Sequence, residues 1–397
     1  MNLPRHHPSS PPRRPARPPG LLMGLTLTLL LGAESHACQI CLPFPTESLA
    51  DKVLAARHLV LARENPEKPY TLRATKTLVG DPAPALDLFL DSTTKRWLEL
   101  GADRGVLCAW FSDPGEWRQL ARHDEILGPV LRDMLARRED WTKDPDSRIR
   151  YFADYLGHDD PLLADLAHLE VGRAPYRQIA TYADRVPREK VLEQLAITQR
   201  LEWQALYILL LAQSDHPDDR QLIREKFERN ARWALSLQTA AWATALIEID
   251  GLKGIDRICQ LYLHDVERQP EELAAIHAAL MTQGNEGSPE LLDPIVAAYA
   301  RLLERNPALA PDLADDLTRW QRFDHAAAFS RYLTDTTPDL AATARIRGHL
   351  RAAAEATAPG PSAQPARLAP IFVIAGGMLL VPLLLAVNGR SKAAQAA

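Results

Sequence analysis

The sequence of 397 residues lacks the short motifs that accompany common enzyme chemistries. It contains no His-Glu-x-x-His zinc motif, no Gly-x-Ser-x-Gly nucleophile turn, no P-loop and no glycine pattern for a dinucleotide. It also lacks an excess of positive charge, since the formal net charge is −5. That balance argues against nucleic acid or an anionic lipid surface as a partner. Nothing in the sequence therefore supports catalysis, and no cofactor is expected.

Long apolar runs are confined to the two ends of the chain. Residues 1–37 combine a basic, Pro-rich start with a short apolar core, which predicts a secretory signal peptide cleaved before Cys38. Residues 368–387 carry no charge and have the length that a transmembrane helix needs. A Pro/Ala-rich linker (351–367) precedes this run, and the basic tail at 388–397 favours the cytoplasmic side. The sequence therefore predicts a single-pass protein of the cell membrane, with its bulk outside, in the periplasm.

Cysteine is scarce, with 4 residues in the whole chain. Cys38 and Cys41 form a Cys-x-x-Cys pair, but a c-type haem site would need His where Leu42 stands. Three alternatives remain open for this pair together with Cys108: a disulfide from Cys38 or Cys41 to Cys108, a thiol-redox site, or a site for an unknown metal. We expect the disulfide, because a secreted domain meets an oxidising compartment. Cys259 lies among apolar residues at helical spacing and is expected to be a core residue.

Residues 38–120 are expected to form a small β-barrel domain. Residues 46–56 read as a helix with Thr46 or Ser48 as its N-cap. Short apolar or alternating runs, separated by turn residues, then predict strands at 58–64, 70–80, 85–91 and 105–111.

The opening of this domain, "ACQICLPFPTESLADKVLAARHLVLAREN", resembles the TIMP/netrin-like OB-fold domain of secreted proteins. The likeness covers about 75 residues and rests on an N-terminal cysteine pair, an acidic helix and an alternating first strand. The spacing here is Cys-x-x-Cys, whereas the family has Cys-x-Cys. The resemblance implies an OB-like barrel and, by analogy with the metalloproteinase inhibitors of that family, a role for Cys38 in chelating the zinc of a target protease.

Residues 121–150 are expected to form a helical connector and residues 151–350 a solenoid. Five segments share a plan of an apolar helix, a polar or Gly break and a second amphipathic helix, at 164–184, 204–228, 240–263, 274–303 and 314–333. Their spacing resembles HEAT-like α-solenoid repeats, which bury their apolar faces by stacking. Asp159 or Asp160 is expected to cap the helix that Pro161 begins. The fold class predicted is thus α+β and multidomain: an OB-like barrel, an α-solenoid and one C-terminal transmembrane helix.

Four tryptophans in the repeat helices are candidates for a binding surface: Trp203, Trp233, Trp242 and Trp320. Solenoids present extended surfaces of this kind to protein partners. We therefore expect a membrane-anchored, non-enzymatic interaction or scaffold protein with a protein partner in the cell envelope. The alternatives are a thiol-redox or metal-binding envelope protein that uses Cys38 and Cys41, and a TIMP-like protease inhibitor.

Overall fold

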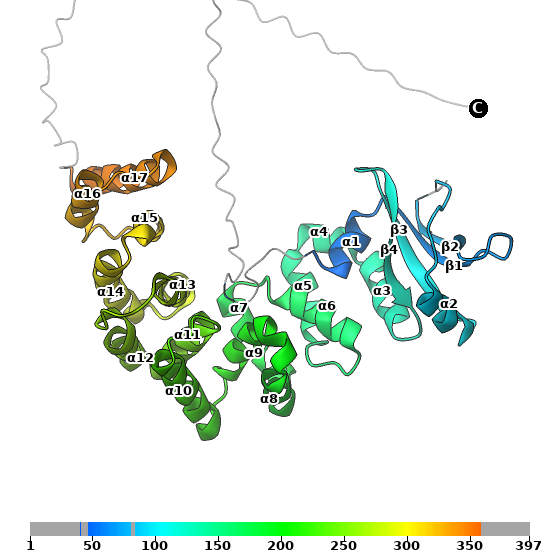
Figure 1. Cartoon of the computed structure of the whole chain (residues 1–397), viewed down its shortest axis with the longest axis horizontal. Coiled ribbons are helices and arrows are strands. Elements are labelled where there is room, and N and C mark those ends of the chain that lie inside the picture. The colour runs from blue at the N-terminus through cyan, green and yellow to red at the C-terminus, as the bar shows by residue number, and fades with distance from the viewer. Residues whose placement is uncertain (1–39, 41–46, 81–83, 359–397) are drawn as a thin grey trace, which may run out of the picture.

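Helices dominate the chain. The computed structural model describes residues 40, 47–80 and 84–358. It is mostly helical (64%), with a small four-stranded antiparallel sheet. Figure 1 shows the sheet at one end, from which the later helices follow one another along a curved arc.

The sheet is open, so the predicted OB-like barrel is wrong. Its strands are β1 (His58–Glu64), β2 (Leu72–Val79), β3 (Gly105–Phe111) and β4 (Glu116–His123). They lie in the order β2-β1-β3-β4, and every neighbouring pair is antiparallel. A barrel requires the two outer strands to pair with each other, whereas β2 and β4 remain at opposite edges.

The prediction of a strand at 85–91 is also wrong. Leu86, Leu88 and Leu90 pack onto one face of the sheet, but the segment joins the sheet only through an isolated bridge from Phe89 to Thr71. β4 was not predicted, because most of its side chains are polar and the apolar alternation is weak.

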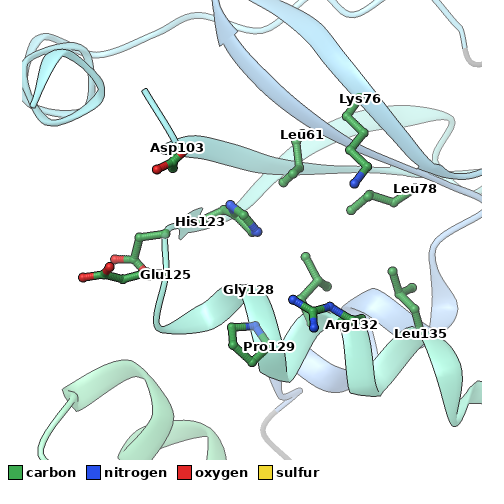
Figure 2. Close-up of a pocket in the computed structure, with 12 residues that line it drawn as sticks. Leu61, Lys76, Leu78, Asp103, His123, Glu125, Gly128, Pro129, Arg132 and Leu135 are labelled. Carbon is green, nitrogen blue, oxygen red and sulfur yellow. The ribbon is translucent and has the colours of Figure 1, made fainter. Parts of the chain in front are cut away.

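Alternating side chains divide the sheet into two buried faces. Val60 and Cys108 face the side covered by α2 (Ser92–Glu99). Leu59 and Leu107 face the side covered by α1 (Leu49–Ala55) and α3 (Leu127–Ala136). Figure 2 shows this second side, with the sheet above α3.

The remaining helices follow in chain order. They are α4 (Arg138–Lys143), α5 (Pro145–Ala153), α6 (Pro161–Val171), α7 (Tyr176–Ala180), α8 (Arg188–Ala196), α9 (Gln204–Leu211), α10 (Pro217–Arg232), α11 (Thr239–Asp250), α12 (Leu252–Ile258), α13 (Pro270–Glu286), α14 (Leu292–Arg305), α15 (Ala310–Arg319), α16 (Ala326–Asp335) and α17 (Leu340–Thr357). Short 3₁₀ or π segments join several of them, including η2 (Thr198–Trp203) between α8 and α9. The predicted cap is confirmed at Asp160, whose carboxylate accepts the Leu163 N–H at 3.1 Å.

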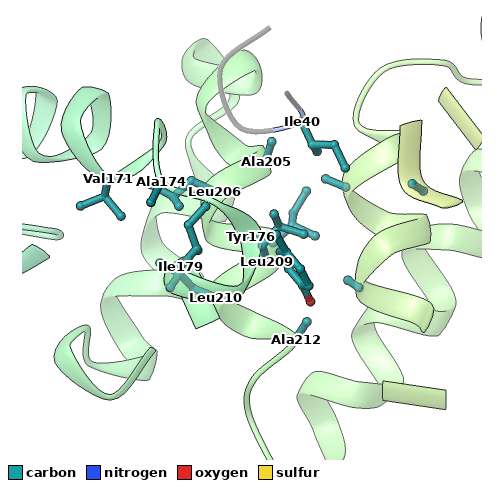
Figure 3. Close-up of a cluster of buried hydrophobic side chains, with 14 of the residues drawn as sticks. Ile40, Val171, Ala174, Tyr176, Ile179, Ala205, Leu206, Leu209, Leu210 and Ala212 are labelled. Atoms are coloured by element: carbon teal, nitrogen blue, oxygen red, sulfur yellow. The ribbon is translucent and has the colours of Figure 1, made fainter. Parts of the chain in front are cut away.

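Two helices lie at the centre of the helical part. Every residue of α9 is buried, as are most residues of α11, which is typical of helices that are apolar all round. α9 packs against α11, and α11 packs against α13. Figure 3 shows part of the buried apolar core, to which Ile40 of the N-terminal segment, Ala205 of α9 and Tyr176 of α7 all belong.

The prediction of a single-pass membrane protein is corrected. Among the helices of residues 47–80 and 84–358, none has the length and apolar composition needed to cross a bilayer. The segment on which that prediction fell, 368–387, lies outside the described residues, as do the predicted signal peptide and the predicted tail.

Replacing either of two helix glycines by alanine is expected to change the stability of the fold, in opposite directions. A Cβ at Gly284 in α13 would overlap the indole of Trp320, whereas nothing lies within 4 Å of a Cβ at Gly348 in α17. We expect Gly284→Ala to lower the free energy of unfolding by about 1–3 kcal/mol through overpacking. Gly348→Ala is expected to raise it by about 0.5–1 kcal/mol, because alanine loses less backbone entropy in a helix. Urea denaturation of both variants checks this, and a shift of the same sign in both would contradict the packing described.

Candidate protein-interaction surface

The loop that joins α10 to α11 presents large apolar side chains to solvent. Trp233 is 67% exposed, Leu235 43% and Leu237 54%. Leu201, from η2, is 41% exposed, and its carbonyl oxygen accepts a hydrogen bond from the Gln238 side chain of the same loop. We call these four residues, Leu201, Trp233, Leu235 and Leu237, the apolar loop surface.

Two residues of this loop have backbone conformations that side chains disfavour. Ala234 has φ 50° and Gln238 has φ 62°, both in the left-handed region. Each such residue costs on the order of 1 kcal/mol, so the surrounding contacts must compensate. Strain of this kind is found where a loop must hold one particular shape.

Buried polar groups under the loop supply that compensation. Asn230, at the end of α10, donates from its side-chain amide to the Leu237 carbonyl at 3.1 Å and to the Thr239 hydroxyl at 3.0 Å. The Leu235 N–H donates to the Asn230 carbonyl at 3.0 Å, and the Thr239 hydroxyl donates to the Leu235 carbonyl at 2.6 Å. Asn230 and Thr239 are themselves buried. The loop is therefore tied down with its leucines outward.

A hollow of about 300 Å³, lined mostly by charged side chains of α10, lies beside Trp233. Its lining includes Lys226 and Arg229 as well as Leu222. Burial, followed by the nearby Arg229 charge, lowers the pKa of Lys226. An apolar centre with a charged rim is the usual composition of a protein interface.

The four tryptophans predicted to form a binding surface differ in how far they are buried. Trp203 stacks on the buried His168 with ring centroids 4.2 Å apart, and Trp242 is buried within α11. Trp320 packs against Tyr299 and donates its indole N–H to the Asn285 side chain at 2.8 Å. Trp233 is the one of these four that is largely exposed.

The exposure of Leu235 and Leu237 was not predicted. The sequence signal was present, because "WALSLQ" places apolar residues alternately in a segment that follows the end of a helix. Alternation alone does not tell an exposed loop from a buried strand, however. The exposure of these leucines follows from the buried contacts of Asn230, which the sequence does not display.

The expected disulfide to Cys108 is wrong. Cys108, in the middle of β3, is a free thiol buried against the α2 face of the sheet, and burial raises its pKa to about 12. Burial thus disfavours the thiolate, which is the form that reacts in thiol chemistry and binds metals. Cys259 is likewise free, and burial raises its pKa. Cys38 and Cys41 lie outside the described residues.

The part of the chain that the structure describes contains no set of ligands for a metal ion. Nowhere in it do three or more His, Cys, Asp or Glu side chains come together in a way that could hold an ion.

No protein-family model, no curated protein and no solved structure matches this chain.

Proposed function

We propose that the chain is a non-enzymatic interaction or scaffold protein that binds a protein partner through the apolar loop surface. The observation that carries this proposal is the combination of exposure and rigidity. Trp233, Leu235 and Leu237 remain in water on a loop that buried hydrogen bonds hold in a strained shape. A loop under no such constraint would turn its leucines inward, because burying each stabilises by about 1.5–3 kcal/mol.

The residue types also favour a protein partner. Tryptophan is enriched among the side chains that contribute most to protein binding, and it acts where neighbouring apolar groups exclude water. Lys226, Arg229 and Glu225 around Trp233 provide both signs of charge at the rim. Such a rim selects a partner by charge complementarity more than it adds affinity.

A double substitution separates binding from folding. Leu235→Ser with Leu237→Ser removes two exposed leucines, so we expect the free energy of unfolding to change by less than about 1 kcal/mol. The measurement is the size of the native complex that contains the chain, in gently lysed cells of its own source. In the double variant we expect the chain to run at the size of the free chain. The matched control is Leu252→Ser, because Leu252 is 49% exposed but begins α12, beyond the far end of α11.

Retention of the complex by the double variant, or its equal loss in the control, would rule out this surface. If the wild-type chain is already free in its own cells, the scaffold function itself fails. A complex made of two copies of the chain would identify the partner as a second copy.

A further inference from the structure

A second feature of the molecule is a cavity of about 450 Å³ between the sheet and α3. Leu61 of β1 and Leu78 of β2 form its wall on the sheet side, and Leu131 and Leu135 of α3 form the opposite wall. Figure 2 shows these side chains around a common space. The cavity has room for a small molecule with a short apolar chain.

Two positive side chains point into this space. Figure 2 shows the Lys76 ammonium entering from β2 and the Arg132 guanidinium from α3. Within the described residues neither group forms an ion pair or a hydrogen bond with the protein, although ion pairs hold many other arginines of the chain, such as Arg148 and Arg224. Both charges are therefore available to an anion.

His123, at the end of β4, adds a third nitrogen. Its Nδ1 is covered by the protein and has no hydrogen-bond partner among the described residues. The remainder of the ring therefore lines the cavity and is the part that can meet a ligand. Burial lowers the pKa of His123, which leaves the ring neutral at pH 7 and able to donate one N–H.

Three negative side chains line the cavity, and one of them, Asp124, accepts the Ile126 and Leu127 N–H groups at the start of α3. Figure 2 places Asp103 and Glu125 beyond His123, away from Lys76 and Arg132. One end of the space thus attracts a single negative charge, the leucines accept an apolar chain, and the far end repels a second negative charge.

We propose that this cavity binds a carboxylate carried on a short apolar chain, with the carboxylate between Lys76 and Arg132. The carboxylate has two possible sources with the same chemistry: a free monocarboxylic acid, or the C-terminus of a peptide that ends in an apolar residue. The proposal is independent of the apolar loop surface, which lies on other elements of the fold.

Calorimetric titration of the purified chain with hexanoate tests this site. We expect hexanoate to bind at least tenfold more tightly than hexanol, which lacks the charge, and than hexanedioate, whose second carboxylate meets the acidic end. Lys76→Gln and Arg132→Gln are each expected to weaken hexanoate binding at least fivefold. The matched control is Arg73→Gln, an exposed cation on β2 that does not line the cavity.

The titration of His123, followed by NMR with and without hexanoate, gives a second readout. A carboxylate bound beside the ring stabilises its protonated form, so we expect the pKa of His123 to rise on binding. The rise is expected to disappear in Arg132→Gln. A peptide ending in leucine with a free C-terminus, compared with its C-terminal amide, distinguishes the two sources: tighter binding of the free peptide than of hexanoate assigns a peptide ligand, and the reverse assigns a free acid.

Three results would overturn the site. These are no hexanoate binding, equal binding of hexanol, or equal loss of affinity in Arg73→Gln. Because Lys76, Arg132 and Arg73 are all exposed, none of these variants is expected to disturb the fold.

Discussion

Replacing Glu170 with alanine is expected to lower the free energy of unfolding by about 3 kcal/mol. Glu170, in α6, is buried, with a side chain that is 2% exposed. It accepts hydrogen bonds from the Ser48 hydroxyl and from the Arg148 guanidinium, the latter at 2.5 Å. Removing one partner of a buried ion pair costs about 3–5 kcal/mol, because the other charge remains buried and poorly compensated. We expect the lower end, since Arg148 keeps its bond to Asp51 at 2.6 Å.

This cluster joins elements that are distant in the sequence. Ser48 and Asp51 cap α1, which packs beneath the sheet, while Arg148 and Glu170 belong to α5 and α6 of the helical part. Arg173 adds a further ion pair to Asp51 at 2.6 Å. Loss of Glu170 should therefore loosen the attachment of the sheet to the helices.

Urea denaturation of Glu170→Ala measures the effect, and Glu193→Ala is its control. Glu193 pairs with Lys190 at 3.4 Å but is 60% exposed, so its removal is expected to cost less than about 1 kcal/mol. Equal effects in the two variants would show that the buried cluster does not hold the structure together.

The second large effect expected is a loss of stability in mild acid through His168. This side chain of α6 is fully buried and stacked on Trp203, and neither ring nitrogen has a hydrogen-bond partner among the described residues. Burial, with a smaller contribution from the Arg200 charge, lowers its pKa from 6.5 to about 3. Below pH 6.5, His168 is therefore protonated in the unfolded chain, whereas in the folded chain it stays neutral down to about pH 3.

Stability then falls as the pH drops through this window. Each pH unit within it costs about 1.4 kcal/mol, so this group is expected to contribute a loss of about 2–3 kcal/mol between pH 7 and pH 4.5. Most carboxylates titrate below pH 4.5, which keeps their protonation largely out of the comparison. His123 and His349, whose pKa values burial also lowers, remain the same in every variant.

His168→Phe tests this expectation, because phenylalanine keeps an aromatic ring for the stack on Trp203. The free energy of unfolding is measured by urea denaturation at pH 7 and at pH 4.5 for the variant and for the wild type. We expect the decrease between the two pH values to be about 2–3 kcal/mol smaller in the variant than in the wild type. His264→Gln, at an exposed histidine, is expected to behave as the wild type. The same pH dependence in all three proteins would show that His168 is not held neutral.

Local sequence patterns predicted the individual elements of this fold better than their assembly. The strands at 58–64 and 105–111 match β1 and β3, because both are short apolar runs between turn residues. The segment 85–91 has a similar pattern, yet its leucines pack beside α2 without pairing along a strand. Whether an apolar run pairs or only packs depends on its neighbours, so the barrel could not be distinguished from an open sheet.

The candidate site shows the same limit. Trp233 was named from the sequence, but so were Trp203, Trp242 and Trp320, which pack within the helical part. Exposure is a property of the assembled helices, and composition does not reveal it. The cluster of Glu170 with Arg148 and Ser48 was missed for a related reason, since the Ser48–Glu170 contact spans 122 positions in the sequence.

The most direct test of the proposed function is site-specific photo-crosslinking in the cells that produce the protein. A photoreactive phenylalanine derivative is placed at Leu237, on the apolar loop surface, or at Leu252 as a control of similar exposure. The account predicts one discrete adduct from position 237, absent from position 252, whose partner binds the purified chain and not the Leu235→Ser, Leu237→Ser variant. No adduct, or the same adducts from both positions, would contradict a protein-binding role for this surface.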